Sequence, residues 1–335
     1  MRFADLTTFR VGGEIANVVR GDSEELILKT LVTDPDAYVV GGGSNILASD
    51  IPFNGTVLVV NTKGSALDYD ACSGGMITVA AGVLWDEFVA QTVAAGFSGL
   101  ETLSGIPGKV GAAPIQNIGA YGQEFSTVVA RVRAWDRSAR QQRTFTANQC
   151  AFGYRTSLFK KEPNRYVILD VTVQLKKGDL SIPITYPELA KELAVSVGER
   201  ASVSKVRERT LAIRERKGMV LSEQDHDSWS AGSFFINPSV SPEIAAVLPA
   251  DAPKWPNTDG SIKLSAAWLL ERSGVVKGER LGGAGISTKH VLAITNAADA
   301  TSQEIIELAQ RCQNAVQKHF NITLEPEVQL LGVSL

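Results

Sequence analysis

Three kinds of side chain in this 335-residue sequence could handle negative charge on a small substrate. Arg155, in "CAFGYRTSLFK", carries a guanidinium that suits a carboxylate by two parallel hydrogen bonds. Its neighbours are aromatic or small rather than charged, which favours a buried role over a surface salt bridge. Ser233, in "SAGSFFINP", offers a hydroxyl before two phenylalanines, although a helix-cap or turn serine would look the same. Glu325 and Glu327, in "LEPEV", would share one face of a strand, as catalytic acids or as paired surface acids.

A long, nearly uncharged stretch offers a backbone that a ligand can approach closely. Residues 104–124, "SGIPGKVGAAPIQNIGAYGQE", hold five glycines and two prolines, and Lys109 and Glu124 are the only charged residues in it. Glycine permits close approach and positive φ, and proline lowers the cost of ordering the chain. Ser104 and Asn117 add neutral donors and acceptors. This lining suits a large apolar ring system with a polar edge and a diphosphate, as in FAD, although a long structural loop is the alternative.

A second glycine-rich segment follows a predicted strand at "VVGGGSNIL". A dinucleotide motif of the form G-x-G-x-x-G would need glycine at Ile46, and it would need a helix to follow. The next predicted strand also ends in Asn61, where an acid would hold a ribose. We therefore interpret 41–45 as a nest of backbone N–H groups for a pyrophosphate, with an ordinary hairpin turn as the alternative.

Composition and cysteine use narrow the class of protein. A net charge of −3 and dispersed basic residues predict no nucleic acid or membrane as partner. The N-terminus has no apolar signal region and no apolar run reaches 18 residues, so we expect a cytoplasmic protein. Cys72, Cys150 and Cys312 are expected to be reduced thiols. With three histidines and no H-E-x-x-H, we expect no metal site, and the absence of G-x-S-x-G argues against a serine hydrolase.

The pattern of apolar residues interleaves strands and helices, so the class is α/β or α+β. Residues 218–230 are polar and rich in turn formers, which predicts a loop, and 231–319 look mostly helical. The predicted helices are 22–31, 84–95, 186–196, 203–217 and 301–320. Asp22 or Ser23 should cap the first helix, Gly96 should end the second, and Thr301 or Ser302 should cap the last. The predicted strands are 37–40, 55–61, 76–82, 128–136, 165–175, 290–296 and 322–332.

Taken in order, "GGGSN", "SGIPGKVGAAPIQNIGAYG", "FGYRTSLFK", "AGSFFINP" and "LEPEV" resemble the UDP-N-acetylenolpyruvoylglucosamine reductase (MurB) family. These motifs span residues 41–328, nearly the whole chain. The resemblance implies an α+β chain, with an FAD-binding fold of the vanillyl-alcohol-oxidase type in two subdomains and an α+β substrate-binding domain. The expected limits are 1–60 and 61–205 for the two subdomains, 206–320 for the substrate-binding domain, and 321–335 for a tail that returns to the active site.

The resemblance implies NADPH-dependent reduction of UDP-N-acetylglucosamine enolpyruvate to UDP-N-acetylmuramate through FAD. This reaction belongs to peptidoglycan precursor synthesis, and so to cell-wall biogenesis, cell shape and cell division. No histidine precedes His226, so FAD should be non-covalent. The expected partners are NADPH and the enolpyruvyl substrate, and no residue pattern sets the oligomeric state, with a monomer slightly favoured. Two rival functions are a flavin-dependent alcohol oxidase of the same fold and a non-catalytic nucleotide-sugar binding protein.

The resemblance also assigns residues. Arg155 would clamp the enolpyruvyl carboxylate, Ser233 would give a proton to carbon, and Glu327, directly before Val328, would act with Arg155 on the developing charge. A raised pKa would help Glu327 in this role. The expected FAD-binding residues are Gly41, Gly42, Gly43, Ser44, Asn45, Ser104, Gly105, Ile106, Pro107, Gly111, Asn117, Gly119, Ala120, Tyr121, Gly122 and Arg214. The expected substrate-binding residues are Tyr154, Tyr186, Lys217 and Asn237. Arg214 and Lys217 could instead belong to the solvated face of a helix.

Overall fold

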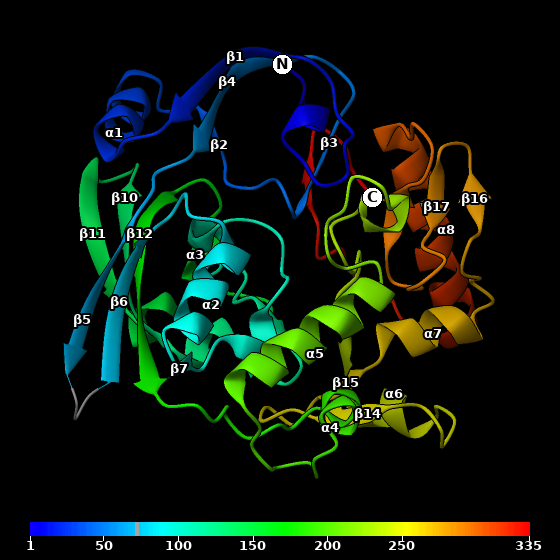
Figure 1. Cartoon of the computed structure of the whole chain (residues 1–335). Helices are drawn as coiled ribbons and strands as arrows, with labels where there is room; N and C mark the ends of the chain where they lie inside the picture. Colours follow the sequence, from blue (N-terminus) through cyan, green and yellow to red (C-terminus); the bar gives the residue numbers. More distant parts are fainter. Residues whose placement is uncertain (71–73) are drawn as a thin grey trace. The chain divides into compact units, whose positions relative to one another are not determined.

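The computed structural model describes residues 1–70 and 74–335 (Figure 1). Contacts between Cα atoms divide the chain into two compact units, and each of them is made of separate segments. Unit 1 consists of Met1–Glu14, Gly43–Phe53 and Lys217–Leu335, and unit 2 consists of Ile15–Gly42 and Asn54–Arg216. The domain limits expected from the sequence stay a prediction.

Unit 2 contains a small sheet in which β4 lies between β1 and β2. Its elements are β1 (Ile15–Gly21), α1 (Glu24–Thr33), β2 (Tyr38–Val40) and β4 (Phe53–Val60). Strands β2 and β4 are parallel, and the four residues that end β4 are all buried, which explains their continuous apolar sequence. The Ser23 hydroxyl accepts the Leu26 N–H at 3.2 Å, so one of the two predicted caps of α1 is confirmed.

The larger sheet of unit 2 is antiparallel, in the order β11-β10-β12-β6-β5, with β7 beside β12. Its strands are β5 (Ser65–Asp70), β6 (Gly74–Ala80), β7 (Phe97–Ser98), β10 (Val129–Asp136), β11 (Gln141–Thr146) and β12 (Tyr166–Lys177). Val79 of β6 pairs with Val171 of β12, and both are fully buried. Trp85 and Phe88, from the helix that follows β6, belong to the same apolar core. The predicted strands 76–82, 128–136 and 165–175 are confirmed.

Helices and one hairpin complete unit 2. These are α2 (Trp85–Ala94), β8 (Gly119–Ala120), β9 (Gln123–Glu124), α3 (Leu158–Lys161), α4 (Pro187–Leu193) and α5 (Val203–Arg216). Gly96 follows α2 at φ 71°, which confirms the predicted glycine termination of that helix. Helix α5 contacts both α2 and α4 (Figure 1). It also contacts residues 101–103, directly before the glycine-rich stretch.

Unit 1 combines three small sheets with helices. Its elements are β3 (Ile46–Ala48), β13 (Ser239–Val240), α6 (Pro242–Ala246), β14 (Lys254–Pro256), β15 (Ile262–Leu264), α7 (Ala266–Arg272), β16 (Arg280–Leu281), β17 (Ala284–Ile286), β18 (Ile294–Asn296), α8 (Ser302–Phe320) and β19 (Gln329–Leu331). The sheets are β3 with β19, β13-β15-β14, and β16-β17-β18. Helix α8 packs on β17 and β18 (Figure 1). The prediction that 231–319 is mostly helical was wrong, because its strands of two or three residues are too short to show an alternating pattern.

Six short 3₁₀ helices lie in the described residues: η1 (Phe3–Asp5), η2 (Glu101–Leu103), η3 (Val110–Ala112), η4 (Phe125–Thr127), η5 (Asn148–Cys150) and η6 (His226–Ser228). The predicted loop 218–230 contains the last of these. Cys150 and Cys312 are buried free thiols, and Cys72 lies outside the described residues. Within residues 1–70 and 74–335, no helix has the length and apolar character needed to cross a membrane.

Candidate functional site

The first glycine segment begins in unit 2 at the carboxyl edge of the parallel strands β2 and β4. Gly41 and Gly42 directly follow β2. A Cβ atom on Gly42 would lie 2.7 Å from the Gly108 Cα, whereas one on Gly41 would meet the Lys109 Cβ at an ordinary 3.8 Å. The two bare segments found in the sequence therefore meet backbone to backbone at this edge of the sheet.

A charged pair holds the second glycine segment in shape. Gly105 has φ 73°, and its N–H donates to Asp86 Oδ1 at 2.6 Å. The guanidinium of Arg207 donates to both oxygens of Asp86, at 2.6 and 2.7 Å. Burial alone would raise the pKa of Asp86, but the bonds from Arg207 and Gly105 outweigh it and hold that pKa below its usual value. The segment continues to Gly111, whose N–H donates to the Ala81 carbonyl at 2.9 Å.

Two side chains predicted to contact FAD are bonded to the protein itself. Ser104 is fully buried, and its hydroxyl donates to the Glu101 carbonyl at 2.7 Å. The buried Asn117 amide donates to Glu124 Oε2 at 2.7 Å and to the Gly153 carbonyl at 3.0 Å. These bonds give both side chains a role in shaping the loop, and their contact with FAD stays a prediction.

Arg155 sits in a tight turn with an uncommon backbone conformation. The backbones of Gly153 and Thr156 exchange hydrogen bonds at 3.0 and 3.2 Å, which leaves Tyr154 and Arg155 at the tip. Arg155 has φ 51°, in the left-handed region that non-glycine residues adopt at a cost, often at functional sites. Its guanidinium donates to the Gly119 carbonyl at 2.7 Å. The structure thus brings Arg155 against the hairpin of the glycine-rich stretch.

Tyr121, Tyr186 and Arg214 come together in unit 2. The two tyrosine rings meet edge to face at 5.3 Å, and Tyr121 has φ 50°. Burial raises the pKa of Tyr121 to about 12, so it is a protonated phenol that can donate at neutral pH. Arg214 is 8% exposed, and burial lowers the pKa of its guanidinium while Tyr121 opposes that shift. Arg214 is therefore a buried cation and not part of a solvated helix face.

In unit 1, the segments of Ser233 and Glu327 run side by side. Phe235 and Pro326 form an antiparallel bridge, and the Glu327 N–H donates to the Phe234 carbonyl at 2.8 Å. Ser233 directly precedes Phe234, so Ser233 and Glu327, the predicted proton donor and the predicted acid, lie on neighbouring segments of the polypeptide. Both residues are partly buried.

Asn45 fixes the tail that carries Glu327. Its Nδ2 donates to the Glu327 carbonyl at 3.0 Å, and its own carbonyl accepts the Gln329 N–H at 2.9 Å. These bonds extend the parallel pairing of β3 with β19. Glu325 is exposed whereas Glu327 is partly buried, so burial separates two acids that sequence spacing did not. The asparagine of the "GGGSN" motif has a structural task here, and its contact with FAD stays a prediction.

The remaining predicted residues of unit 1 are placed as follows. Gly43 has φ 59°, and a Cβ there would lie 1.9 Å from the Leu6 carbonyl oxygen, so the chain requires glycine. The Asn237 side chain accepts the Ala266 N–H at 2.9 Å at the start of α7. Lys217 and Ser44 are partly buried.

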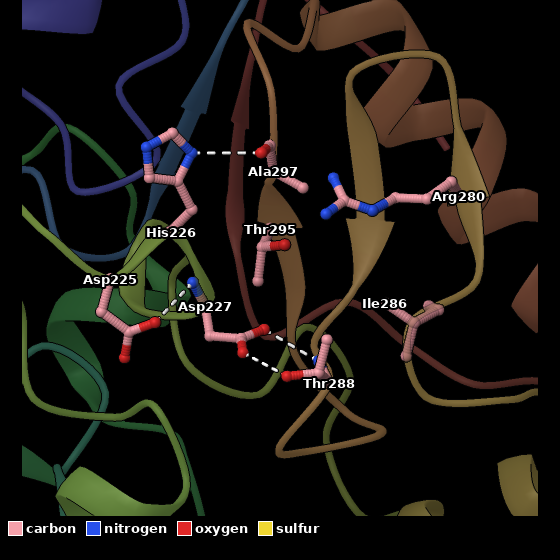
Figure 2. A pocket seen from close by; sticks show the side chains of 8 residues that line it. All are labelled: Asp225, His226, Asp227, Arg280, Ile286, Thr288, Thr295 and Ala297. Carbon is pink, nitrogen blue, oxygen red and sulfur yellow. Dashed lines mark hydrogen bonds between the residues drawn. The ribbon is translucent and has the colours of Figure 1, made fainter.

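The loop before Ser233 borders a polar cavity of about 140 Å³ (Figure 2). The Asp227 carboxylate accepts the N–H and hydroxyl of Thr288 at 2.8 and 2.5 Å. The His226 ring stacks on Trp229 at 3.7 Å, and its Nδ1 donates to the Ala297 carbonyl at 3.1 Å. These contacts anchor the polar loop predicted at 218–230. The cavity is lined by Asp225, His226, Asp227, Arg280, Ile286, Thr288, Thr295 and Ala297.

The geometry of unit 2 fits a flavin with a diphosphate. Gly41 and Gly42 leave backbone uncovered by side chains at the edge of a sheet. The space beside Gly41 is open, because a Cβ atom there would meet only ordinary contact. Asp86 and Arg207, which shape the second segment, were not among the predicted site residues, because they lie 121 positions apart. Lys109 was not among them either, although a single lysine inside the glycine-rich stretch was a usable signal.

Comparison with known proteins gives consistent matches. A profile described as "UDP-N-acetylenolpyruvoylglucosamine reductase, C-terminal domain" matches residues 224–331, and one described as "FAD binding domain" matches 32–144. A UDP-N-acetylenolpyruvoylglucosamine reductase of Cutibacterium acnes is 48% identical over 99% of this chain and 89% of its own. One of Streptomyces avermitilis is 44% identical over 99% of this chain and 94% of its own. The crystal structure of the Thermus caldophilus enzyme is 25% identical, with a TM-score of 0.66, and the match covers 99% of this chain and 97% of that one.

Proposed function

The chain belongs to the UDP-N-acetylenolpyruvoylglucosamine reductase family, and from this premise we propose that it reduces UDP-N-acetylglucosamine enolpyruvate to UDP-N-acetylmuramate with NADPH. The observation that carries the proposal is the match of 48% identity over 99% of the chain. The fold is the α+β FAD-binding fold that the motifs predicted. We further propose that the reaction serves peptidoglycan precursor synthesis, and so cell-wall biogenesis, cell shape and cell division.

The cofactor is FAD, as the match to an FAD-binding domain supports. When bound, FAD carries hydride from NADPH to the enolpyruvyl double bond. We propose that the backbone of the two glycine segments, Gly41–Gly42 and Gly105–Gly111, holds it without a covalent bond. Tyr121 and the buried Arg214 add a donor and a positive charge from the other loops of unit 2.

Two residues are proposed to act on the substrate carboxylate. Addition of hydride to the methylene carbon leaves negative charge beside the carboxylate, and a fixed cation stabilises that charge. Arg155 suits this task because its guanidinium is permanently charged and its backbone is held in a tight turn. Glu327 is proposed to act on the same carboxylate as a hydrogen-bonded acid.

Ser233 is proposed to deliver the proton that completes the reduction. A hydroxyl is a weak acid, but a carbanion-like intermediate is basic enough to take its proton. The segment around Ser233 is held in a fixed place because its neighbour Phe234 bonds the backbone of Glu327. Phe234 and Phe235 are both buried, so the segment is anchored in the core of unit 1.

Further roles follow the family motifs. Tyr154, Tyr186, Lys217 and Asn237 are proposed to contact the substrate, and the tail 321–335 to bring Glu327 to it. We retain the domain division at residues 60, 205 and 320 as part of this proposal. A cytoplasmic location is proposed because NADPH and a uridine-diphosphate sugar are both small molecules of that compartment.

The test is an assay of the full chain with NADPH and UDP-N-acetylglucosamine enolpyruvate. We expect oxidation of NADPH that depends on the enolpyruvyl group, with formation of the lactyl ether detected by mass spectrometry. UDP-N-acetylglucosamine, which lacks the enolpyruvyl group, is the matched control. Reduction of the protein by an alcohol without NADPH demand would favour an oxidase, and UDP binding without bound flavin would favour a binding protein.

A further inference from the structure

Lys109 crosses the carboxyl edge of the parallel strands in unit 2. It lies inside the second glycine segment, yet its ammonium reaches to the end of β4. There its Nζ donates to the Val60 carbonyl at 2.6 Å and lies 3.3 Å from the Asn61 Oδ1. Val60 follows Val59, which pairs with the last residue of β2, so the ammonium stands level with Gly41. A cation is thus held beside the bare backbone of the first glycine segment.

The charges around Lys109 leave this edge positive. Burial, with added repulsion from Lys63 and Arg20, lowers the pKa of Lys109 to about 8, while Asp22 acts in the opposite direction. The Asp22 carboxylate also accepts a hydrogen bond from Asn61 Nδ2 at 2.5 Å. The positive charges of Lys109, Lys63 and Arg20 are therefore opposed only by the Asp22 carboxylate in this group, and that carboxylate already accepts a hydrogen bond. Holding a partly buried ammonium beside two like charges is costly unless an anion completes the group.

We propose that Lys109 binds a phosphate of FAD at the carboxyl edge of β2 and β4, and that it is a determinant of the affinity of this chain for the diphosphate. Ligands of open sheets bind outside the carboxyl ends of parallel strands, where Gly41 and Gly42 leave backbone exposed. A lysine ammonium serves a phosphate as a point charge. Arg20 and Lys63 add to the field from the exposed side. This inference rests on FAD as the cofactor of the proposed function.

The proposal has a consequence for pH. A bound phosphate favours the charged ammonium, so the pKa of Lys109 is higher in the complex than in the free protein. The complex is therefore strongest below pH 8, and FAD affinity falls as pH rises through about 8. The other charged groups that face this ammonium are Arg20, Asp22 and Lys63. K63M is measured in parallel to separate the contribution of the second ammonium from that of Lys109.

The test uses the full chain freed of flavin and reconstituted. Dissociation constants for FAD and for riboflavin, which has no phosphate, are measured by fluorescence at pH 7 and pH 9. We expect K109M to weaken FAD roughly 10- to 100-fold, the range of a charge-assisted hydrogen bond, and to leave riboflavin within about twofold. For the wild type, the ratio of the riboflavin to the FAD dissociation constant should be smaller at pH 9 than at pH 7. For K109M, this ratio should be the same at both pH values. K29M, which removes an exposed lysine of α1, is the matched control and should behave as wild type.

Each contrary result has its own meaning. FAD affinity of K109M within twofold of wild type would overturn the proposal. Equal weakening of FAD and riboflavin would overturn it too, because a phosphate contact does not act on riboflavin. A raised KM for NADPH with unchanged FAD affinity would assign the charge to the phosphates of NADPH instead. Failure of the wild-type chain to bind FAD at all would refute the proposed function and not this inference alone.

Discussion

At the scale of single residues, Ser233 has the most specific of the proposed roles. A proton donor at this position is needed when carbon takes a proton and not when NADPH delivers hydride. Ser233→Ala should therefore leave flavin reduction by NADPH within a few-fold of wild type. Reoxidation by the enolpyruvyl substrate should slow by roughly 10²- to 10⁴-fold, as measured in anaerobic stopped flow. Ser241→Ala removes an exposed hydroxyl as a control. Equal loss in both half-reactions would point to damaged structure instead of a lost proton donor.

The two acids of "LEPEV" give a second test at this scale. Glu327 is partly buried and its backbone is bonded to Asn45 and Phe234, whereas Glu325 is exposed. Glu327→Gln keeps the shape of the side chain and removes its charge and its titration. It should spare FAD content and slow reduction of the enolpyruvyl group by orders of magnitude, while Glu325→Gln changes that step little. A larger defect in the Glu325 variant would reverse the assignment.

At the scale of elements, substitutions in the first glycine segment should distinguish residues needed for packing from residues needed for FAD binding. Gly42→Ala places a Cβ 2.7 Å from the Gly108 Cα, so the two segments must move apart. We expect this variant to lose both thermal stability and FAD affinity. Gly41→Ala meets ordinary contact at 3.8 Å and should keep wild-type stability. If FAD lies against this backbone, Gly41→Ala should nonetheless weaken FAD, as measured by fluorescence. Normal FAD affinity in Gly41→Ala would place the diphosphate elsewhere.

The ion pair of α2 with α5 supports the second glycine segment. Asp86 has a lowered pKa, so its stabilisation is present above the ordinary carboxyl value near 4 and is lost as pH falls below that value. Asp86→Asn should cost on the order of 1 kcal/mol of unfolding free energy at pH 7, because the carboxylate is partly exposed. The difference from wild type should shrink as pH falls below the ordinary carboxyl value and Asp86 takes up its proton. Asp68→Asn is the exposed control, and a difference that did not change with pH would contradict a role for the Asp86 charge.

Local sequence signals predicted the elements that depend on neighbouring residues. Ser23 caps α1, Thr301 and Glu304 form a capping box on α8, and Gly96 ends α2. Interactions between distant positions were beyond the sequence. Arg207 contacts Asp86, and Lys109 contacts Val60, only because folding brings these distant positions together. Nothing in the spacing of these residues along the sequence indicates the contacts. The short strands of unit 1 were not predicted, because pairing with neighbouring strands defines them and their own sequences are too short to show a pattern.

The motifs of the site were found from sequence, but the tasks of their side chains were not. Asn45 and Asn117 are polar residues within glycine-rich segments, and each was expected to contact FAD. The structure shows Asn45 bonded to the backbone of Glu327 and Asn117 bonded to Glu124 and Gly153. An asparagine that shapes a loop and one that binds a ligand have the same sequence signature. Their roles could be separated only by locating their partners.

At the scale of the whole molecule, each unit supplies a different part of the proposed chemistry. Unit 2 carries the glycine segments, Lys109, Arg155 and the Tyr121 group. Unit 1 carries Ser233 and Glu327 on neighbouring segments of the polypeptide. With bound FAD, the chain is expected to take hydride from NADPH and deliver it to the enolpyruvyl group.

The most direct measurement is anaerobic stopped-flow absorbance of the purified chain at the flavin band. NADPH should bleach the band, and UDP-N-acetylglucosamine enolpyruvate added without oxygen should restore it in a single turnover. UDP-N-acetylglucosamine should leave the flavin reduced. A band that NADPH does not bleach, or one that returns only when oxygen is admitted, would contradict the account.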